Sequence, residues 1–392
     1  MTEDIMILSA RRTPIGAFQG ALAPMTAPQL GAAAIRGAIE AAGIQPSDLD
    51  ESIMGCVLPA GLGQAPARQA ALGAGVPVEV PATTINKMCG SGMKALMLGA
   101  EQIAAGSARL VVAGGLESMT NAPYLLPKAR SGYRMGHGEI LDHMFYDGLQ
   151  SPWDGKLMGC FADATAAKYG FTRADQDAFA AESVRRAMRA LEAGDFDGEV
   201  TPVTVKSRKG TNTVARDETP LTCDLARIPQ LKPAFGPQGT VTAASSSSIS
   251  DGAAALVLAS AARARDLGRA PIARLVAWCS SALAPEWFTI APVAAISKVL
   301  TAAGWRAQDV DLFEVNEAFA VVAMAAQRDL AIDAQRLNVN GGACALGHPI
   351  GATGARITTT LIHALRRRGG RRGVAALCIG GGEATAVAVE LL

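Results

Sequence analysis

The chain has 392 residues, of which 49% are hydrophobic and 18% are charged, and its formal net charge is +1 at pH 7. This length exceeds what one hydrophobic core normally supports, so two cores or one duplicated core are expected. The near balance of charge gives no reason to expect a nucleic acid or an anionic membrane surface as a partner.

The N-terminal stretch and the cysteines indicate a cellular compartment. MTEDIMILSARRTPIG carries acidic residues before a short apolar run, which is unlike a secretory signal peptide. No stretch has eighteen consecutive apolar residues, so no transmembrane helix is expected. The seven cysteines are odd in number, are scattered and form no CxxC pair, which favours reduced thiols over a disulfide framework or a zinc site. We therefore expect a cytoplasmic protein.

The first part of the chain alternates short apolar runs with amphipathic helical stretches. In chain order these are DIMILSA, a helix over 30–42, ESIMGCVL, a helix after Cys89, and ARLVVAGG. This alternation predicts an α/β fold whose strands are buried on both faces. The buried stripe expected for the helix after Cys89 consists of Met93, Leu96, Met97, Ala100 and Ala104.

The segment 120–241 differs from its surroundings because it is more polar and richer in Gly, Pro and charge. It contains an amphipathic helix over 173–193, for which Thr172 is the expected N-cap. We interpret the segment as an inserted loop domain, and insertions of this kind usually shape a binding site.

A second set of elements follows Pro271. It comprises ARLVAWCSSAL, a helix over 292–303, DLFEVNEAF, RLNVNGGAC, a helix over 352–368, and a closing hairpin of GVAALCIGGG with ATAVAVELL.

The two sets are copies of one unit. AAAIRGAIEAAGIQPSDLDESIMG aligns without a gap with VAAISKVLTAAGWRAQDVDLFEVN, so that a Gly and two Asp residues recur at one spacing: Gly43 with Gly304, Asp48 with Asp309, and Asp50 with Asp311. We expect two α/β halves packed as a pseudo-dimer. The first half is 1–119 completed by 242–269, the second is 270–392, and the loop domain is 120–241.

Cys89 is the first candidate for chemistry. It lies in NKMCGSGMKAL, just before a predicted helix, where exposed amide groups would lower the pKa of its thiol and stabilise a thiolate. The same stretch also fits an inert buried thiol.

His348 could be the partner of that thiol. It lies in NVNGGACALGHPIGATGARI, where Pro349 and the glycines would hold the imidazole in a rigid loop. A neutral imidazole near a thiol is the usual base for a cysteine nucleophile, although a single histidine is more often structural.

Two further stretches carry polar chemistry. Cys378 ends a buried strand in CIGGGEATAV, and the backbone N–H groups of Gly380–Gly382 could bind an oxyanion, although a plain turn also fits. Asn316 and Glu317 follow an apolar strand in EVNEAFA, where a buried amide must be hydrogen-bonded. No metal is expected, because His137, Glu139 and His143 would not share one helix face.

These motifs together resemble the thiolases, the family of acetyl-CoA acetyltransferases and 3-ketoacyl-CoA thiolases. The resemblance rests on NKMCGSGMKAL, GGLESMTNAPY, NEAFA, NVNGGACALGHPIGATGARI and CIGGGEATAVAVE, and it covers nearly the whole chain. It implies a duplicated five-layer α/β/α/β/α fold, a loop domain that binds coenzyme A, no permanently bound cofactor, and a homodimer or homotetramer acting in fatty acid metabolism.

The resemblance also implies roles for single residues. Cys89 would be the acylated nucleophile, His348 would take its proton, and Cys378 would be the acid/base at the α-carbon of the second acyl group. Asn316 would position a water in one oxyanion hole, while the amides of Cys89 and Gly380 would form the other. The residues implied in contact with the acyl-CoA are Leu149, Met158, Arg227, Ala234, Phe235, Ser247 and Phe319.

Three departures from the family pattern bear on the substrate. Leu157 stands where relatives often have a histidine, Ala244 and Ser245 replace a common Gly-Asn, and Pro220 replaces an arginine. The leading hypothesis is acetyl-CoA acetyltransferase activity through an acyl-Cys89 intermediate. The alternatives are a longer-chain 3-ketoacyl-CoA thiolase of β-oxidation, a decarboxylating ketoacyl synthase, and a non-catalytic acyl-CoA or lipid carrier.

Overall fold

The computed structural model describes residues 4–207 and 210–392, and within these residues ten strands form one mixed sheet. Nine strands follow the order β12, β13, β14, β11, β1, β10, β5, β3 and β4, and the short β2 pairs with β10. Their bounds are β1 (Ile5–Arg12), β2 (Gly16–Ala17), β3 (Glu51–Gly55), β4 (Ala82–Ile85), β5 (Leu110–Ser118), β10 (Ser250–Ser260), β11 (Ala273–Ala282), β12 (Leu312–Val315), β13 (Arg372–Ile379) and β14 (Glu383–Leu391). Antiparallel pairing of β1 with β11 joins an N-terminal half to a C-terminal half.

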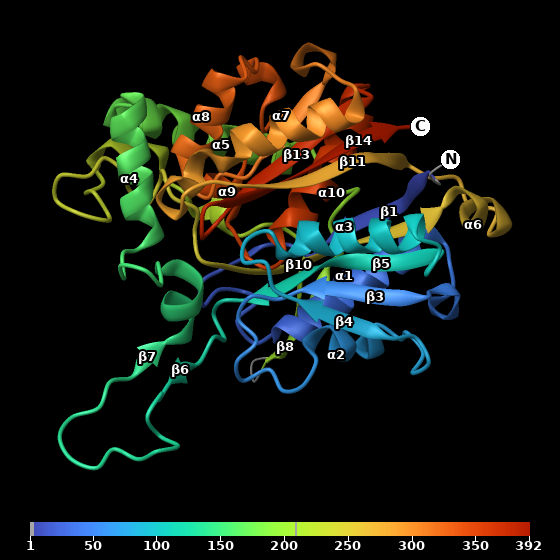
Figure 1. Cartoon of the computed structure of the whole chain (residues 1–392), viewed down its shortest axis with the longest axis horizontal. Coiled ribbons are helices and arrows are strands. Elements are labelled where there is room, and N and C mark those ends of the chain that lie inside the picture. Colours follow the sequence, from blue (N-terminus) through green and yellow to red (C-terminus); the bar gives the residue numbers. More distant parts are fainter. Residues whose placement is uncertain (1–3, 208–209) are drawn as a thin grey trace.

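Helices cover both halves and also separate them, as Figure 1 shows. One apolar cluster joins α1 and α2 to the N-terminal half, a second joins α3 and α10 to both halves, and a third joins α7 and α8 to the C-terminal half. The layers are therefore α/β/α/β/α, as expected. The helices of the two halves are α1 (Ala27–Ala42), α2 (Pro66–Gly73), α3 (Ser91–Ala104), α6 (Ala261–Asp266), α7 (Ala291–Ala303), α8 (Ala320–Asp329), α9 (Ala343–Leu346) and α10 (Thr353–Arg368).

The internal repeat recurs in the detailed geometry of the two halves. Helices α1 and α7 each end at a glycine in the left-handed region, with φ of 65° at Gly43 and 69° at Gly304. Asp50 accepts hydrogen bonds from two successive backbone N–H groups at the start of β5, and Asp311 does the same at the start of β13. Equivalent carboxylates thus tie equivalent strands together in both halves.

Two sequence expectations are wrong in detail. RLNVNGGAC forms no strand, because Asn338 has a left-handed backbone (φ 47°) and its side-chain amide bonds both the N–H and the C=O of Val315. The segment pairs with β12 at Leu337, which forms an isolated parallel bridge with Phe313, and beyond that point the Asn338 side chain replaces backbone pairing. In α3, Ala104 is exposed and Ile103 is buried instead, because Ile103 follows Ala100 by three residues and Leu96 by seven and so continues their face of the helix.

The segment 120–241 has its own small elements. They are β6 (Tyr124–Leu125), β7 (Leu141–Asp142), a π-helix (Met144–Leu149), α4 (Met158–Tyr169), α5 (Arg173–Glu192), β8 (Val203–Ser207), β9 (Gly210–Val214) and two short 3₁₀ helices (Thr219–Thr222 and Leu225–Gln230). Thr172 caps α5 through a capping box with Asp175, as predicted. The loop between β6 and β7 extends away from the body (Figure 1). Among the described helices, none combines the length and apolarity needed to cross a membrane.

Candidate active site

Cys89 lies on the connection from β4 to α3, in a locally strained backbone. The residue before it, Met88, has a left-handed φ of 46°, a conformation that is uncommon for a side chain of this size and that is frequent at functional sites. Cys89 itself is half-buried, and its neighbour Gly90 packs so closely on Ile379 that a side chain at Gly90 would overlap it. The sharp turn thus presents the thiol to the end of β13.

The glycine turn between β13 and β14 lies against this thiol. Lys87 forms an ion pair with Glu383, which ties the Cys89 connection to the first residue of β14. The backbone N–H groups of Gly380 and of Cys89 itself face the Cys89 sulfur. A side chain at Gly380 would meet only the sulfur of Met158, at 3.5 Å, so the space beside this amide is open. Two amide donors therefore converge beside one sulfur, which is the geometry of an oxyanion hole.

Burial decides the protonation state of Cys89. It raises the pKa of the thiol to about 11, although the two facing N–H groups lower it. The sequence-based expectation of a lowered pKa is therefore wrong for the resting protein. The loss of hydration at the sulfur outweighs the partial charges of the amides.

This protonation state predicts the pH dependence of alkylation at Cys89. A thiol with a raised pKa is almost entirely protonated at neutral pH, so its reaction with iodoacetamide should accelerate about tenfold per pH unit from pH 7 to 10. Peptide mass spectrometry of the labelled Cys89 at each pH measures the rate. A plateau near pH 9 would indicate an ordinary thiol, and a pH-independent rate below pH 8 would indicate a thiolate–imidazolium pair. Either result would contradict the assignment.

His348 lies in the loop between α9 and α10 and is 5% exposed. Burial, reinforced by the charge of Arg356, lowers its pKa to about 3, so the imidazole is neutral at pH 7. The Thr353 hydroxyl donates to the Pro349 carbonyl at 2.9 Å, so it accepts a hydrogen bond from His348 Nδ1–H at 2.6 Å. The Nε2 lone pair is therefore free to accept a proton.

Asn316 directly follows β12 and is 1% exposed. Its Nδ2 lies 3.5 Å from His348 Nε2, and its Oδ1 lies 3.5 Å from Nη2 of Arg356. The structure thus brings Asn316 and His348 together. Sequence reasoning missed Thr353 and Arg356, because a helical Thr or Arg carries no signal until its neighbours in space are known.

Cys378 lies near the C-terminal end of β13 and is 1% exposed. Burial raises the pKa of its thiol well above the ordinary value, and the nearby Cys89 sulfur raises it further. The two thiols are therefore close enough to interact electrostatically. Cys378 remains a neutral thiol at pH 7, which suits a proton donor.

Glu117 is a buried carboxylate that sequence reasoning left without a role, although it lies in GGLESM. It accepts hydrogen bonds from the backbone N–H groups of Val57 (2.9 Å), Leu58 (3.2 Å) and Gly351 (2.9 Å). Burial raises its pKa to about 7. Glu117 thereby fixes the loop after His348 against the wall beside Cys89.

A pocket of about 230 Å³ opens beside these groups. Leu157 lines this pocket together with other apolar side chains, so the polar contact that a histidine at position 157 would offer is missing. Six residues suggested by the sequence line this pocket: Leu149, Met158, Phe235, Ser247, Phe319 and His348. Met119 and Ile350 line the pocket and belong to the apolar cluster against which Cys89 packs, so the pocket lies close to the thiol.

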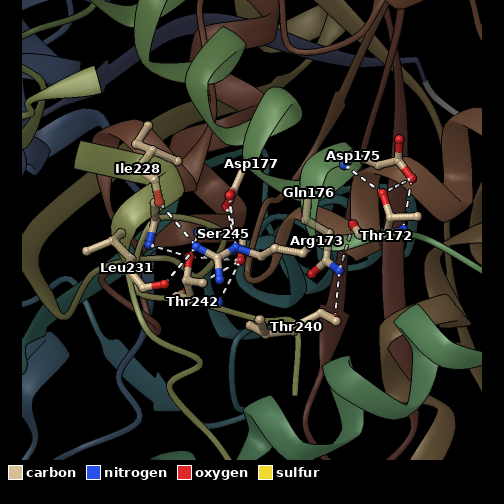
Figure 2. Close-up of polar contacts among 12 residues, drawn as sticks. Thr172, Arg173, Asp175, Gln176, Asp177, Ile228, Leu231, Thr240, Thr242 and Ser245 are labelled. Carbon is tan, nitrogen blue, oxygen red and sulfur yellow. Dashed lines mark hydrogen bonds and ion pairs between the residues drawn. The ribbon is translucent and has the colours of Figure 1, made fainter. Parts of the chain in front are cut away.

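The first turns of α5 hold the chain at Ile228, Leu231 and Thr240, as Figure 2 shows, and Phe235 lies between the last two in sequence. Arg173 pairs with Asp177 and donates to the carbonyls of Ile228 and Leu231. Gln176 bonds Thr240 at 2.9 Å. Phe235 then packs on Gly159, where any side chain would overlap the ring.

The structure leaves two suggested residues outside this pocket. Ala234 and Arg227 are both exposed, and neither lines it. A larger pocket of about 540 Å³ between α5 and α8 reaches Glu317 but none of Cys89, His348 and Cys378. The smaller pocket is therefore the candidate substrate site, because His348 lines it and the larger pocket reaches none of the three reactive groups.

Comparison with known proteins is consistent with this geometry. Residues 5–262 match the thiolase N-terminal domain and residues 269–391 match the thiolase C-terminal domain. The chain is 50% identical over 387 residues to an acetyl-CoA acetyltransferase of Pseudomonas aeruginosa, covering 98% of each chain, and 48% identical to one of Escherichia coli over the full length of both. The crystal structure of the Bacillus anthracis acetyl-CoA acetyltransferase superposes with a TM-score of 0.97 at 40% identity, over 100% of this chain and 99% of that one.

Proposed function

Because the chain belongs to the thiolase family, we propose that it is an acetyl-CoA acetyltransferase that interconverts acetoacetyl-CoA plus CoA with two molecules of acetyl-CoA. The single observation that carries the chemistry is that two amide N–H groups and a second thiol face Cys89, while a neutral imidazole lines the adjacent pocket. We assign acetyl as the transferred acyl group because both full-length relatives are named acetyl-CoA acetyltransferase.

In the cleavage direction, Cys89 is the nucleophile and His348 the base. The proton of the Cys89 thiol moves to His348 Nε2, and the sulfur attacks the ketone carbon of acetoacetyl-CoA. The bond between this carbon and the α-carbon then breaks, and its electron pair forms the enolate of acetyl-CoA. The products of this half-reaction are acetyl-Cys89 and that enolate.

Cys378 completes both halves of the reaction. Its neutral thiol donates a proton to the enolate carbon and releases acetyl-CoA. The resulting Cys378 thiolate takes the proton of the incoming CoA thiol, whose sulfur attacks acetyl-Cys89. Acetyl-CoA leaves, and the Cys89 thiolate recovers its proton from His348. Because the acyl group is held on the enzyme between two substrates, ping-pong kinetics are expected.

Two oxyanion sites follow from the donors. The N–H groups of Gly380 and Cys89 would stabilise the oxygen on the carbon bonded to Cys89. Asn316 and His348 would stabilise the thioester oxygen of the enolate, with Asn316 acting through a positioned water. Support for this assignment comes from the proximity of the two side chains and from their burial.

The pantetheine arm of CoA is proposed to occupy the pocket lined by Met158, Phe235, Ser247 and Phe319. Leu149 would border the acyl group. Ala234 would add an apolar wall for the pantetheine arm. Pro220 stands where the family has an arginine, so the exposed Arg227 would instead supply the charge that faces the nucleotide. We propose that the loop domain 120–241 binds CoA, and that the halves are 1–119 with 242–269, and 270–392.

The acyl specificity is tested by CoA-dependent cleavage of acetoacetyl-CoA and of 3-ketoacyl-CoAs with six to sixteen carbons, at one CoA concentration. We expect cleavage of acetoacetyl-CoA, with kcat/KM falling at least about tenfold once the chain is longer, because the pantetheine arm fills the pocket and a longer acyl chain would meet Leu149 and the apolar side chains that pack around Cys89. Activity that persists or rises with chain length would instead indicate a degradative thiolase of fatty-acid β-oxidation. A chain that binds acyl-CoA without turnover would be a carrier.

We further propose a homo-oligomer, with a homotetramer as the favoured form. The extended segment between β6 and β7 exposes large apolar side chains, including Met135 at 97% and Ile140 at 65%, and such a segment is typical of an association surface. We also propose a cytoplasmic location, which is supported by the free cysteines of the described residues. The proposed metabolic role is in fatty acid metabolism.

A further inference from the structure

Arg356 is a fully buried arginine at the back of the proposed active site. It lies on the first turn of α10, three residues after Thr353, and is 1% exposed. Its Nη2 donates to Asn316 Oδ1 at 3.5 Å, while its Nε and Nη1 have no hydrogen-bond partner among the described residues. Burying a guanidinium with so few partners is costly, so its presence calls for a reason.

Arg12 provides a direct contrast within the same chain. It is 0% exposed, and it donates to Glu199 at 2.5 Å, to Asp217 through two bonds of 2.7 and 2.9 Å, and to the Thr13 carbonyl at 3.2 Å. A buried arginine that serves stability uses its donors in this way. Arg356 instead makes one side-chain hydrogen bond within the described residues, and its partner is Asn316.

That one bond determines which way the Asn316 amide points. A guanidinium can only donate, so the amide oxygen must face Arg356 and the amide N–H₂ must face His348 Nε2. The Nε2 atom is an acceptor, because Nδ1–H is committed to Thr353. A flipped amide would place its oxygen against this lone pair and its N–H₂ against the guanidinium. Both new contacts would be repulsive.

We propose that Arg356 is a positioning residue that holds the Asn316 amide with its N–H₂ directed at the oxyanion site shared with His348. The inference rests on the proposed function, in which this site stabilises the enolate oxygen. Glu314, two residues before Asn316 on β12 and 2% exposed, attracts Arg356 electrostatically, but burial raises the pKa of Glu314 to about 8, so it compensates the cation only in part at pH 7. The burial of Arg356 is therefore incompletely compensated, and the bond to Asn316 is what fixes its orientation.

A double-mutant cycle between Arg356 and Asn316 tests the proposal. Arg356→Lys keeps the charge but loses the planar donor fork. In the wild-type background it should lower kcat for acetoacetyl-CoA cleavage about ten- to hundredfold, with KM changed less than about threefold. In an Asn316→Ala background, the same substitution should lower the residual kcat by less than about twofold, because its target is already gone.

A matched control separates positioning from packing. Thr360 lies one turn further along α10, is 0% exposed, and donates to Glu199 at 3.0 Å, so Thr360→Val perturbs the same buried charges without touching Asn316. Its kcat should stay within about twofold of wild type. Added guanidinium at low millimolar concentration should partly restore kcat in Arg356→Ala and leave Thr360→Val unchanged.

The outcomes are distinguishable. An equal loss from Arg356→Lys in both backgrounds, or wild-type kcat in Arg356→Lys, overturns the positioning role while the thiolase activity stands. If Arg356→Ala does not fold, the double-mutant cycle with Arg356→Lys alone tests the positioning role. Wild-type protein without any cleavage activity would refute the proposed function itself, independently of Arg356.

Discussion

Replacing Cys89 with serine is expected to lower kcat for acetoacetyl-CoA cleavage by roughly 10⁴-fold or more. A serine hydroxyl at this half-buried position has no accessible anion, and the neutral His348 is too weak a base to create one. The release of acetyl-CoA under saturating CoA measures the effect. Intact-mass analysis after incubation with acetyl-CoA should at the same time show loss of the acetylated enzyme.

Cys223→Ser is the matched control for this substitution. Cys223 is also half-buried, but it packs in the apolar cluster beneath α5, which does not include Cys89. That variant should keep kcat within about twofold, since a surface-proximal substitution away from the site is nearly neutral. Wild-type-like cleavage by Cys89→Ser would remove Cys89 from the mechanism.

Replacing Cys378 with alanine should separate the two chemical steps. Loss of this acid/base is expected to reduce acetoacetyl-CoA formation and cleavage by about 10² to 10⁴-fold. Acetylation of Cys89 by acetyl-CoA should be slowed much less, because the CoA thiolate is a good leaving group that departs without a proton from Cys378, whereas the enolate carbon must be protonated. Intact mass for acetylation and a coupled assay for carbon–carbon cleavage, applied to the same preparation, make the comparison.

Cys279→Ala controls for packing in the same core. Cys279 is buried in the apolar cluster that contains Cys378, and its thiol donates to the Ala295 carbonyl at 3.2 Å. Both variants should lose similar stability, and only Cys378→Ala should lose the carbon–carbon step. Full condensation activity in Cys378→Ala would instead point to chemistry like that of the decarboxylating ketoacyl synthases.

Much of the architecture could be predicted from local sequence signals. The N-cap at Thr172, the C-terminal ends of the helices at 42 and 303 and the β13–β14 hairpin are all encoded within a few residues, and the structure confirms them. The predicted strand at RLNVNGGAC failed, because an alternating apolar pattern does not reveal that Asn338 will use its side chain against β12. Whether a side chain replaces backbone pairing beside a strand depends on a partner that is distant in the sequence.

By itself, the sequence determined the duplicated α/β unit and the segments that meet at the site, because spacing, glycine placement and apolar periodicity are local properties of the chain. Only the tertiary structure decided the electrostatics. Burial raises the pKa of Cys89, contrary to what its position before a helix suggested, and it lowers that of His348. The structure alone also revealed Thr353, Arg356 and Glu117 around the reactive groups. Hydration and hydrogen-bond partners depend on which distant segments pack together, and no stretch of sequence specifies that on its own.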